Sequence, residues 1–145
     1  MDGFMNYDVM AACRSATGRA ELPAFCAVLT ELGSRTDARI ELMRLSRIQP
    51  GTIISLHTGL HNTRWRLHMG LQVPSSYHAH MRVGGRTVEW QVGKAFVFDD
   101  SFEHEVGWEP PVREMDMRAS EARIILIVDF RHPDAPSSQP VCPPV

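Results

Sequence analysis

From Arg39 onward, apolar and polar residues alternate with a period of two over many short segments. This period is typical of β-strands, because successive side chains point to opposite faces of a sheet. The predicted strands span 39–48, 52–57, 64–73, 78–83, 86–91, 95–98, 104–107 and 123–129. Helices do not alternate with them, so the pattern favours an antiparallel sandwich or barrel, and a double-stranded jelly roll (cupin-like) fits best.

The first third of the chain has helical character instead. Apolar residues at spacings of three and four predict a helix over 21–32, with Gly33 and Ser34 ending it, and a shorter helix is predicted over 8–14. The apolar stripe consists of Leu22, Phe25, Cys26 and Leu29. The sequence therefore predicts one or two helices over 1–37, before a β core over 38–132.

The connections between the predicted strands are short, with two exceptions. Gly84-Gly85 predicts a two-residue hairpin, because its turn needs positive φ angles, which glycine adopts readily. The segment 108–122 is long for a loop in a compact domain, and such loops are commonly lids, binding loops or mobile segments. The tail 133–145 is rich in proline and is expected to be disordered. At 145 residues, the chain is expected to form one domain over 1–132.

Composition narrows the compartment and the class of partner. The net charge of -2 gives no general attraction to nucleic acid or to an anionic membrane. No apolar run reaches the 18 residues or so of a membrane span, and the start lacks the order of a signal peptide, so a cytoplasmic protein is expected. Cys13, Cys26 and Cys142 are odd in number and far apart, which predicts reduced thiols rather than disulfides or a thiolate zinc site.

Two histidines are candidates for one metal site. His57 ends a predicted strand, and His104 follows the segment Phe98–Glu103. Paired imidazoles with open positions suit iron, copper, nickel or zinc, and non-haem iron oxygenases commonly add a carboxylate. A carboxylate two residues after His57 would point at the same metal, but Gly59 occupies that position. The glycine leaves a coordination position open and predicts weaker metal binding.

The predicted strand 64–71 has one cationic face. Arg64, Arg66 and His68 lie on that face, while the opposite face is apolar and is expected to pack in the core. Charged side chains are buried only when they are paired, so this face suits a pocket that receives carboxylates. Arg123 opens an apolar strand and is a second candidate clamp, because its planar group binds a carboxylate bidentately. A dicarboxylate could be held at both ends.

The stretch from Leu22 to Pro133 resembles the catalytic domain of the aspartyl/asparaginyl β-hydroxylases, which use Fe(II) and 2-oxoglutarate. The resemblance covers about three quarters of the chain. It rests on ordered blocks at 46–52, 57–59, 62–71, 90–94, 98–106 and 127–133. The family has the same His-x-Gly departure from the usual iron ligands, so the resemblance explains Gly59.

The resemblance also implies roles for individual residues. His57 and His104 would hold the iron, and Arg64 would face the substrate. The residues around 2-oxoglutarate would be Ser46, Arg66, His68 and Arg123, and Arg66 also counts among the catalytic residues. Arg123 with the Ser46 hydroxyl would anchor the distal carboxylate, while His68 and Arg66 would steady the other end. Which cation serves which carboxylate stays open.

The implied reaction consumes O2 and 2-oxoglutarate and releases succinate and CO2 as a substrate C–H bond is hydroxylated. The expected substrate is an aspartyl or asparaginyl residue or a related acidic, amino-acid-derived molecule, and it could be an acidic peptide, a protein or a small molecule. No nucleic-acid or membrane partner is expected. Two alternatives remain, namely a non-catalytic jelly-roll module that binds a metal or a carboxylate ligand, and a zinc hydrolase. The zinc hydrolase is weaker, because no third ligand stands at a suitable spacing from either histidine.

Overall fold

The computed structural model describes residues 4–35, 39–74, 79–108 and 122–135. The helices are α1 (Val9–Cys13), α2 (Ala16–Glu21) and α3 (Pro23–Arg35). The strands are β1 (Phe4–Asp8), β2 (Ile40–Ile48), β3 (Ile54–His57), β4 (Arg64–Gln72), β5 (Ala79–Val83), β6 (Arg86–Glu89), β7 (Ala95–Asp99), β8 (His104–Trp108) and β9 (Arg123–Arg131). In the described part of the chain, no helix is long and apolar enough to cross a membrane.

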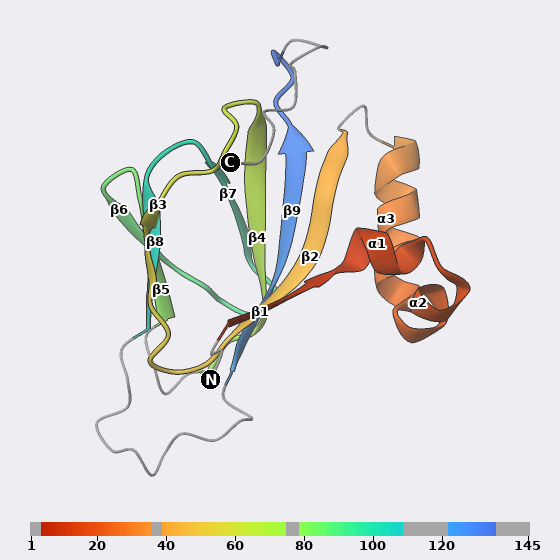
Figure 1. The fold of residues 1–145 in the computed structure, drawn as a ribbon, viewed down its shortest axis with the longest axis horizontal. Coiled ribbons are helices and arrows are strands. Elements are labelled where there is room, and N and C mark those ends of the chain that lie inside the picture. The colour runs from red at the N-terminus through yellow and green to blue at the C-terminus, as the bar shows by residue number, and fades with distance from the viewer. Residues whose placement is uncertain (1–3, 36–38, 75–78, 109–121, 136–145) are drawn as a thin grey trace.

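The strands form two sheets that face each other. Sheet A has the order β1-β2-β9-β4-β7, and sheet B has the order β3-β8-β5-β6. Neighbouring strands within both sheets pair antiparallel. The three helices lie on the side of sheet A that faces away from sheet B (Figure 1). The predicted mainly-β jelly-roll fold with helices at its start is confirmed, although the described residues contain three helices where one or two were predicted.

Alternation along the central strands of sheet A divides the core in two. Met43, Leu126 and Val128 point to the helices and pack with Val9 and the apolar side chains of α1 and α3. On β9, Ile125 and Ile127 alternate with Leu126 and Val128 and point to sheet B, where they join a second cluster. On β4, the apolar face packs on the helix side, as expected from the sequence. The polar face of β4 therefore points into the space between the sheets.

The predicted helical start is wrong for residues 4–8, which form β1 and pair antiparallel with β2. All five residues of β1 are exposed, so neither face produces the alternation that marks a half-buried strand. The change to helix occurs at Asp8, whose carboxylate accepts a hydrogen bond from the Ala11 N–H at 2.9 Å. The helix expected to end at Gly33 and Ser34 instead continues to Arg35.

The predicted hairpin is confirmed, because Gly84 and Gly85 join β5 to β6 with φ angles of 53° and 76°. Of the long predicted loop, residues 109–121 lie outside the described residues. The same holds for residues 136–145 of the proline-rich tail. The expectations for these two segments stay predictions.

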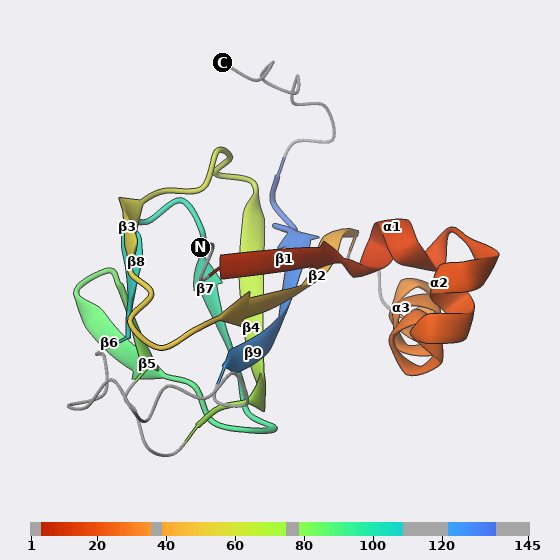
Figure 2. The same cartoon turned by 60° about the horizontal axis from the view of Figure 1, so that its bottom comes forward.

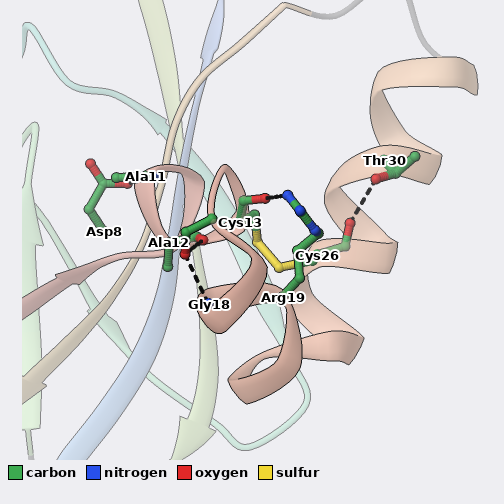
Figure 3. The surroundings of a disulfide bond; sticks show 9 residues. Asp8, Ala11, Ala12, Cys13, Gly18, Arg19, Cys26 and Thr30 are labelled. Carbon is green, nitrogen blue, oxygen red and sulfur yellow. Dashed lines mark hydrogen bonds between the residues drawn. A yellow bond between two sulfur atoms is a disulfide. The ribbon is translucent and has the colours of Figure 1, made fainter.

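Cys13 and Cys26 form a disulfide that joins α1 to α3 (Figure 3). Their Cα atoms lie 5.5 Å apart, although the residues are 13 positions apart in sequence. The expectation of reduced thiols is therefore wrong for this pair, because the fold-back of the helices that brings them together is not visible in the spacing. Cys142 lies outside the described residues, and cytoplasmic localisation stays a prediction.

We expect the double substitution Cys13→Ser/Cys26→Ser to lower the free energy of unfolding by about 3 kcal/mol, the chain-entropy value for a loop of roughly 15 residues. Urea denaturation followed by circular dichroism measures the change. The unsubstituted protein under reducing conditions should show the same loss. A double variant as stable as the parent under oxidising conditions would contradict the prediction.

Candidate active site

The two candidate metal ligands meet at one end of sheet B. His57 ends β3, His104 begins β8, and the two residues are paired across the strands. Their ring centroids are 4.2 Å apart. His57 is exposed, while His104 is only 3% exposed. The structure thus brings together the two imidazoles that the sequence predicts as a pair.

Both rings are held in the same way through their Nδ1 atoms. The Nδ1 of His57 lies 2.7 Å from the carbonyl oxygen of Ser55, and that of His104 lies 2.8 Å from the carbonyl oxygen of Phe102. Because a carbonyl oxygen only accepts, each Nδ1 carries the proton and each Nε2 keeps a free lone pair. Burial also lowers the pKa of His104, which favours its neutral form. Both rings therefore have the tautomer of a ligand that binds metal through Nε2.

The position of the absent third ligand is filled by another carboxylate. A Cβ added at Gly59 would overlap the Asp100 carboxylate, and the Gly59 N–H donates to the Asp100 carbonyl oxygen at 2.7 Å. An Asp100 carboxylate oxygen lies 3.6 Å from Nε2 of His104. Asp100 is fully buried, so a negative charge stands beside the histidine pair although residue 59 supplies none.

The donor set fits a two-histidine metal site. Among the described residues, no group of three or more His, Cys, Asp or Glu side chains is arranged to hold a metal ion. The two imidazoles leave coordination positions open for small oxygen ligands, as expected of a catalytic rather than a structural site. Asp100 would act on a metal here through its charge and its hydrogen bonds.

Arg66 contacts two buried carboxylates, and one of them is the Asp100 carboxylate beside His104. Its Nε and Nη2 donate to Asp129 at 2.6 and 2.7 Å, and its Nη1 lies 2.6 Å from Asp100. Arg66 and Asp129 are direct cross-strand partners on β4 and β9. Arg64 lies 3.2 Å from Asp100 and 3.5 Å from Asp129. All three nitrogens of Arg66 thus have carboxylate partners, and the two arginines balance two buried anions.

A cavity of about 100 Å³ lies between the sheets and contains most of the predicted site residues. It is several times larger than the ~10–15 Å³ that holds one water. Its lining consists of Phe4, Asn6, Arg44, Ser46, Ile54, His57, Arg66, His68, Met81, His104, Val106, Arg123, Ile125 and Ile127. Among the predicted site residues, Arg64 alone does not line this cavity, because its guanidinium lies against Asp100 and Asp129.

The deepest cation of the cavity is Arg123, which is 1% exposed. One of its Nη atoms donates to the Ser46 hydroxyl at 3.2 Å, and its guanidinium carbon lies 4.3 Å from the centre of the Trp90 ring. Its Nε has no partner in the described part of the chain, and no carboxylate pairs with it there. Burial lowers the pKa of Arg123 to about 9, so the group is still charged at neutral pH. An unpaired buried cation beside a hydroxyl is typical of an anion-binding site.

His68 lies beside Arg123 and completes this end of the cavity. The ring is 6% exposed, and neither of its nitrogens has a hydrogen-bond partner among the described residues. Burial, followed by the charges of Arg123 and Arg66, lowers the pKa of His68 well below its usual value. Neutral His68 can therefore offer one N–H donor to a bound molecule without adding charge.

Arg44 is a cavity residue to which the sequence analysis gave no role. It lies on β2, two positions before Ser46 and on the same face. Its Nε is buried without a partner among the described residues, and burial together with Arg66 lowers its pKa. Its place on the Ser46 face was the available signal, since an arginine there points into the space between the sheets.

Comparison with known proteins identifies a family for this chain. The family model described as aspartyl/asparaginyl beta-hydroxylase matches residues 5–133. The chain belongs to the aspartyl/asparaginyl beta-hydroxylase family. The aspartyl/asparaginyl beta-hydroxylase of Mus musculus is 38% identical over 128 residues, which are 88% of this chain and 15% of the mouse protein. The chain thus spans a small part of the length of that relative.

Two further proteins are similar to this chain, one in sequence and one in structure. The ornithine lipid ester-linked acyl 2-hydroxylase of Rhizobium tropici is 37% identical over 89 residues, which are 61% of this chain and 28% of that protein. The crystal structure of an oxidoreductase of the 2OG-Fe(II) oxygenase family from Burkholderia pseudomallei aligns with a TM-score of 0.48 and 14% identity. That alignment covers 79% of this chain and 56% of the other. The names of the mouse and Rhizobium tropici relatives thus point to different substrates.

Proposed function

We propose that this chain is an Fe(II)- and 2-oxoglutarate-dependent hydroxylase that acts on an aspartyl or asparaginyl residue or a related acidic substrate. One observation supports this most directly. The same cavity contains two histidines with free Nε2 atoms and, at its deep end, a buried arginine without a carboxylate partner among the described residues. Family membership supports the same chemistry.

In this proposal, His57 and His104 hold the iron through Nε2. When bound there, ferrous iron supplies the redox chemistry by which O2 and 2-oxoglutarate become succinate and CO2 while the substrate gains a hydroxyl group. The hydrogen bonds to Ser55 and Phe102 orient both rings before any metal arrives.

The deep end of the cavity would bind 2-oxoglutarate. Arg123 and the Ser46 hydroxyl, already hydrogen-bonded to each other, would hold the distal carboxylate. His68 would donate its single N–H to the co-substrate, because burial keeps the ring neutral. The exclusion of water at Arg123 would strengthen its interaction with the anion.

The outer part of the cavity would bind the acidic group of the substrate. Arg44 is suited to this role, since its Nε has no partner in the described residues. Arg66 and Arg64 would act mainly through Asp100 and Asp129, which hold them in place. In this arrangement Arg66 positions the Asp100 carboxylate beside His104.

The test is O2-dependent conversion of 2-oxoglutarate to succinate by the iron-loaded protein. We expect His57→Ala and His104→Ala to lower this rate by more than ~100-fold. Even the loss of a residue that only hydrogen-bonds to a metal ligand lowers activity or metal affinity roughly 10–100-fold. His132→Ala is the matched control, because His132 packs on Trp65 and does not line the cavity. Full turnover by folded variants without either ligand would contradict the proposal. Binding of 2-oxoglutarate without turnover would instead favour a non-catalytic binding module.

A further inference from the structure

β1 is an edge strand whose outer side lacks the usual protection. It pairs with β2 along one side, and among the described residues no strand pairs with its other side (Figure 2). Such an edge presents unpaired N–H and C=O groups to any extended chain, and proteins commonly block it with lysine, proline or a bulge. β1 reads Phe-Met-Asn-Tyr-Asp, and its single charge belongs to Asp8, which caps α1. Within the ranges that the structure describes, the edge is therefore open to another strand.

One face of β1 belongs to the candidate active site. Phe4 and Asn6 line the cavity together with His57 and Arg44. Asn6 is paired in register with Ser46, so both lie on the same face of sheet A. Met5 alternates with them and does not line the cavity. A chain paired with the open edge of β1 would thus lie next to two residues that line the cavity.

The charges of the cavity favour a residue within a polypeptide over a free amino acid. A free amino acid carries an ammonium group, which needs a negative partner. Among the described lining residues none is acidic, and the Asp100 carboxylate beside His104 is already paired with Arg64 and Arg66. Arg44 and Arg123, by contrast, are lining cations without a carboxylate partner in the described part of the chain. The backbone of a polypeptide carries amides instead, which Asn6 and a strand edge can satisfy by hydrogen bonding.

We propose that β1 is the substrate-docking strand. An extended polypeptide segment pairs with its open edge and directs an acidic side chain between Asn6 and Arg44 toward the histidine pair. Main-chain hydrogen bonds to β1 hold the segment, and contacts with Phe4 and Asn6 select its side chains. This inference rests on the proposed function for the hydroxylation of the docked residue. Docking itself can be measured without turnover.

The first test uses capped nonapeptides with a central aspartate and random residues other than proline elsewhere. Hydroxylation is read as a gain of 16 Da by mass spectrometry, with free aspartate as the comparison. We expect Asn6→Ala and Phe4→Ala to raise the KM of the best peptide at least ~10-fold and to leave the affinity for 2-oxoglutarate unchanged. Met5→Ala is the matched control, because Met5 lies on the same strand, is 58% exposed and does not line the cavity.

The second test does not depend on turnover. In the anaerobic complex with Fe(II), 2-oxoglutarate and a peptide of the library, hydrogen exchange at the amides of 4–8 should slow at least ~10-fold. Methylation of the peptide amides, one at a time, should weaken binding only at every second residue. The reason is that only alternate amides of the peptide point to β1 and donate hydrogen bonds to it.

Each other outcome overturns the inference. Unchanged exchange in β1, equal use of free aspartate, or N-methyl effects without alternation would show that β1 does not dock the substrate. If a higher protein concentration slowed hydrogen exchange in β1 without any peptide, and sedimentation showed dimers, the edge would instead bind a second copy of the chain. Failure of the proposed function would be recognised separately. In that case the peptide would still protect β1 from hydrogen exchange, but no succinate would form.

Discussion

If the chain has the proposed function, replacing Arg123 by leucine is expected to raise the dissociation constant for 2-oxoglutarate at least ~100-fold, which corresponds to about 2.8 kcal/mol. The reason is that Arg123 is a buried cation for which the described residues supply a hydroxyl and an aromatic ring but no carboxylate. An anion held there loses its main charged partner, and such truncations cost roughly 2–5 kcal/mol. Calorimetric titration of the iron-loaded protein under anaerobic conditions measures the effect.

Two matched variants separate charge from geometry. Arg123→Lys keeps the charge but loses the planar pair of donors, so its affinity should lie between those of the parent and the leucine variant. Arg131→Leu removes a cation from the far end of the same strand, where Arg131 contacts Glu41, and should leave the affinity unchanged. Equal affinity of the parent and Arg123→Leu would mean that 2-oxoglutarate binds elsewhere.

Replacing Asp129 by alanine lowers the free energy of unfolding by about 3–5 kcal/mol, the range for removing one member of a buried ion pair. Asp129 is fully buried and holds Arg66 through two hydrogen bonds of 2.6 and 2.7 Å. Without it, Arg66 and Arg64 keep Asp100 as their only carboxylate partner among the described residues. Urea denaturation gives the change in free energy.

The ion-pair origin of this loss is tested by a second substitution. In the Asp129→Ala background, Arg66→Met removes the unbalanced cation and should restore part of the lost stability, as a double-mutant cycle would show. Asp134→Ala is the control, because the Asp134 side chain is 90% exposed and its removal should change stability by less than ~0.5 kcal/mol. A loss below ~1 kcal/mol for Asp129→Ala would indicate that the arginines find other partners or water.

Periodicity predicted most of the β core because most of its strands bury at least one face. The strands around Ser46, His68 and His104 were placed within a few residues, and the hairpin at Gly84 followed from its turn chemistry. β1 could not be found in this way, since all its residues are exposed and the pairing with β2 is made by backbone groups. Strand pairing of that kind leaves no pattern in side-chain polarity.

The sequence predicted which residues form the candidate site, but not which of their side chains contact one another. Alternation places Arg66 and His68 on one face, and the structure puts both in the cavity wall. It does not reveal that Asp129, from a distant segment, lies directly opposite Arg66 and engages it. A sequence shows which face a side chain takes, whereas long-range register decides which charges meet.

The contact between Gly59 and Asp100 limits how this site could change. A three-ligand site would need a carboxylate at position 59, but its Cβ would occupy the space of the Asp100 carboxylate. The two side chains exclude each other, so the change requires both substitutions together, and Gly59→Asp alone would displace a carboxylate that balances Arg64 and Arg66. A stepwise path between a two-histidine site and a three-ligand site would therefore pass through an intermediate in which Asp100 is displaced or in which Arg64 and Arg66 lose it as a partner.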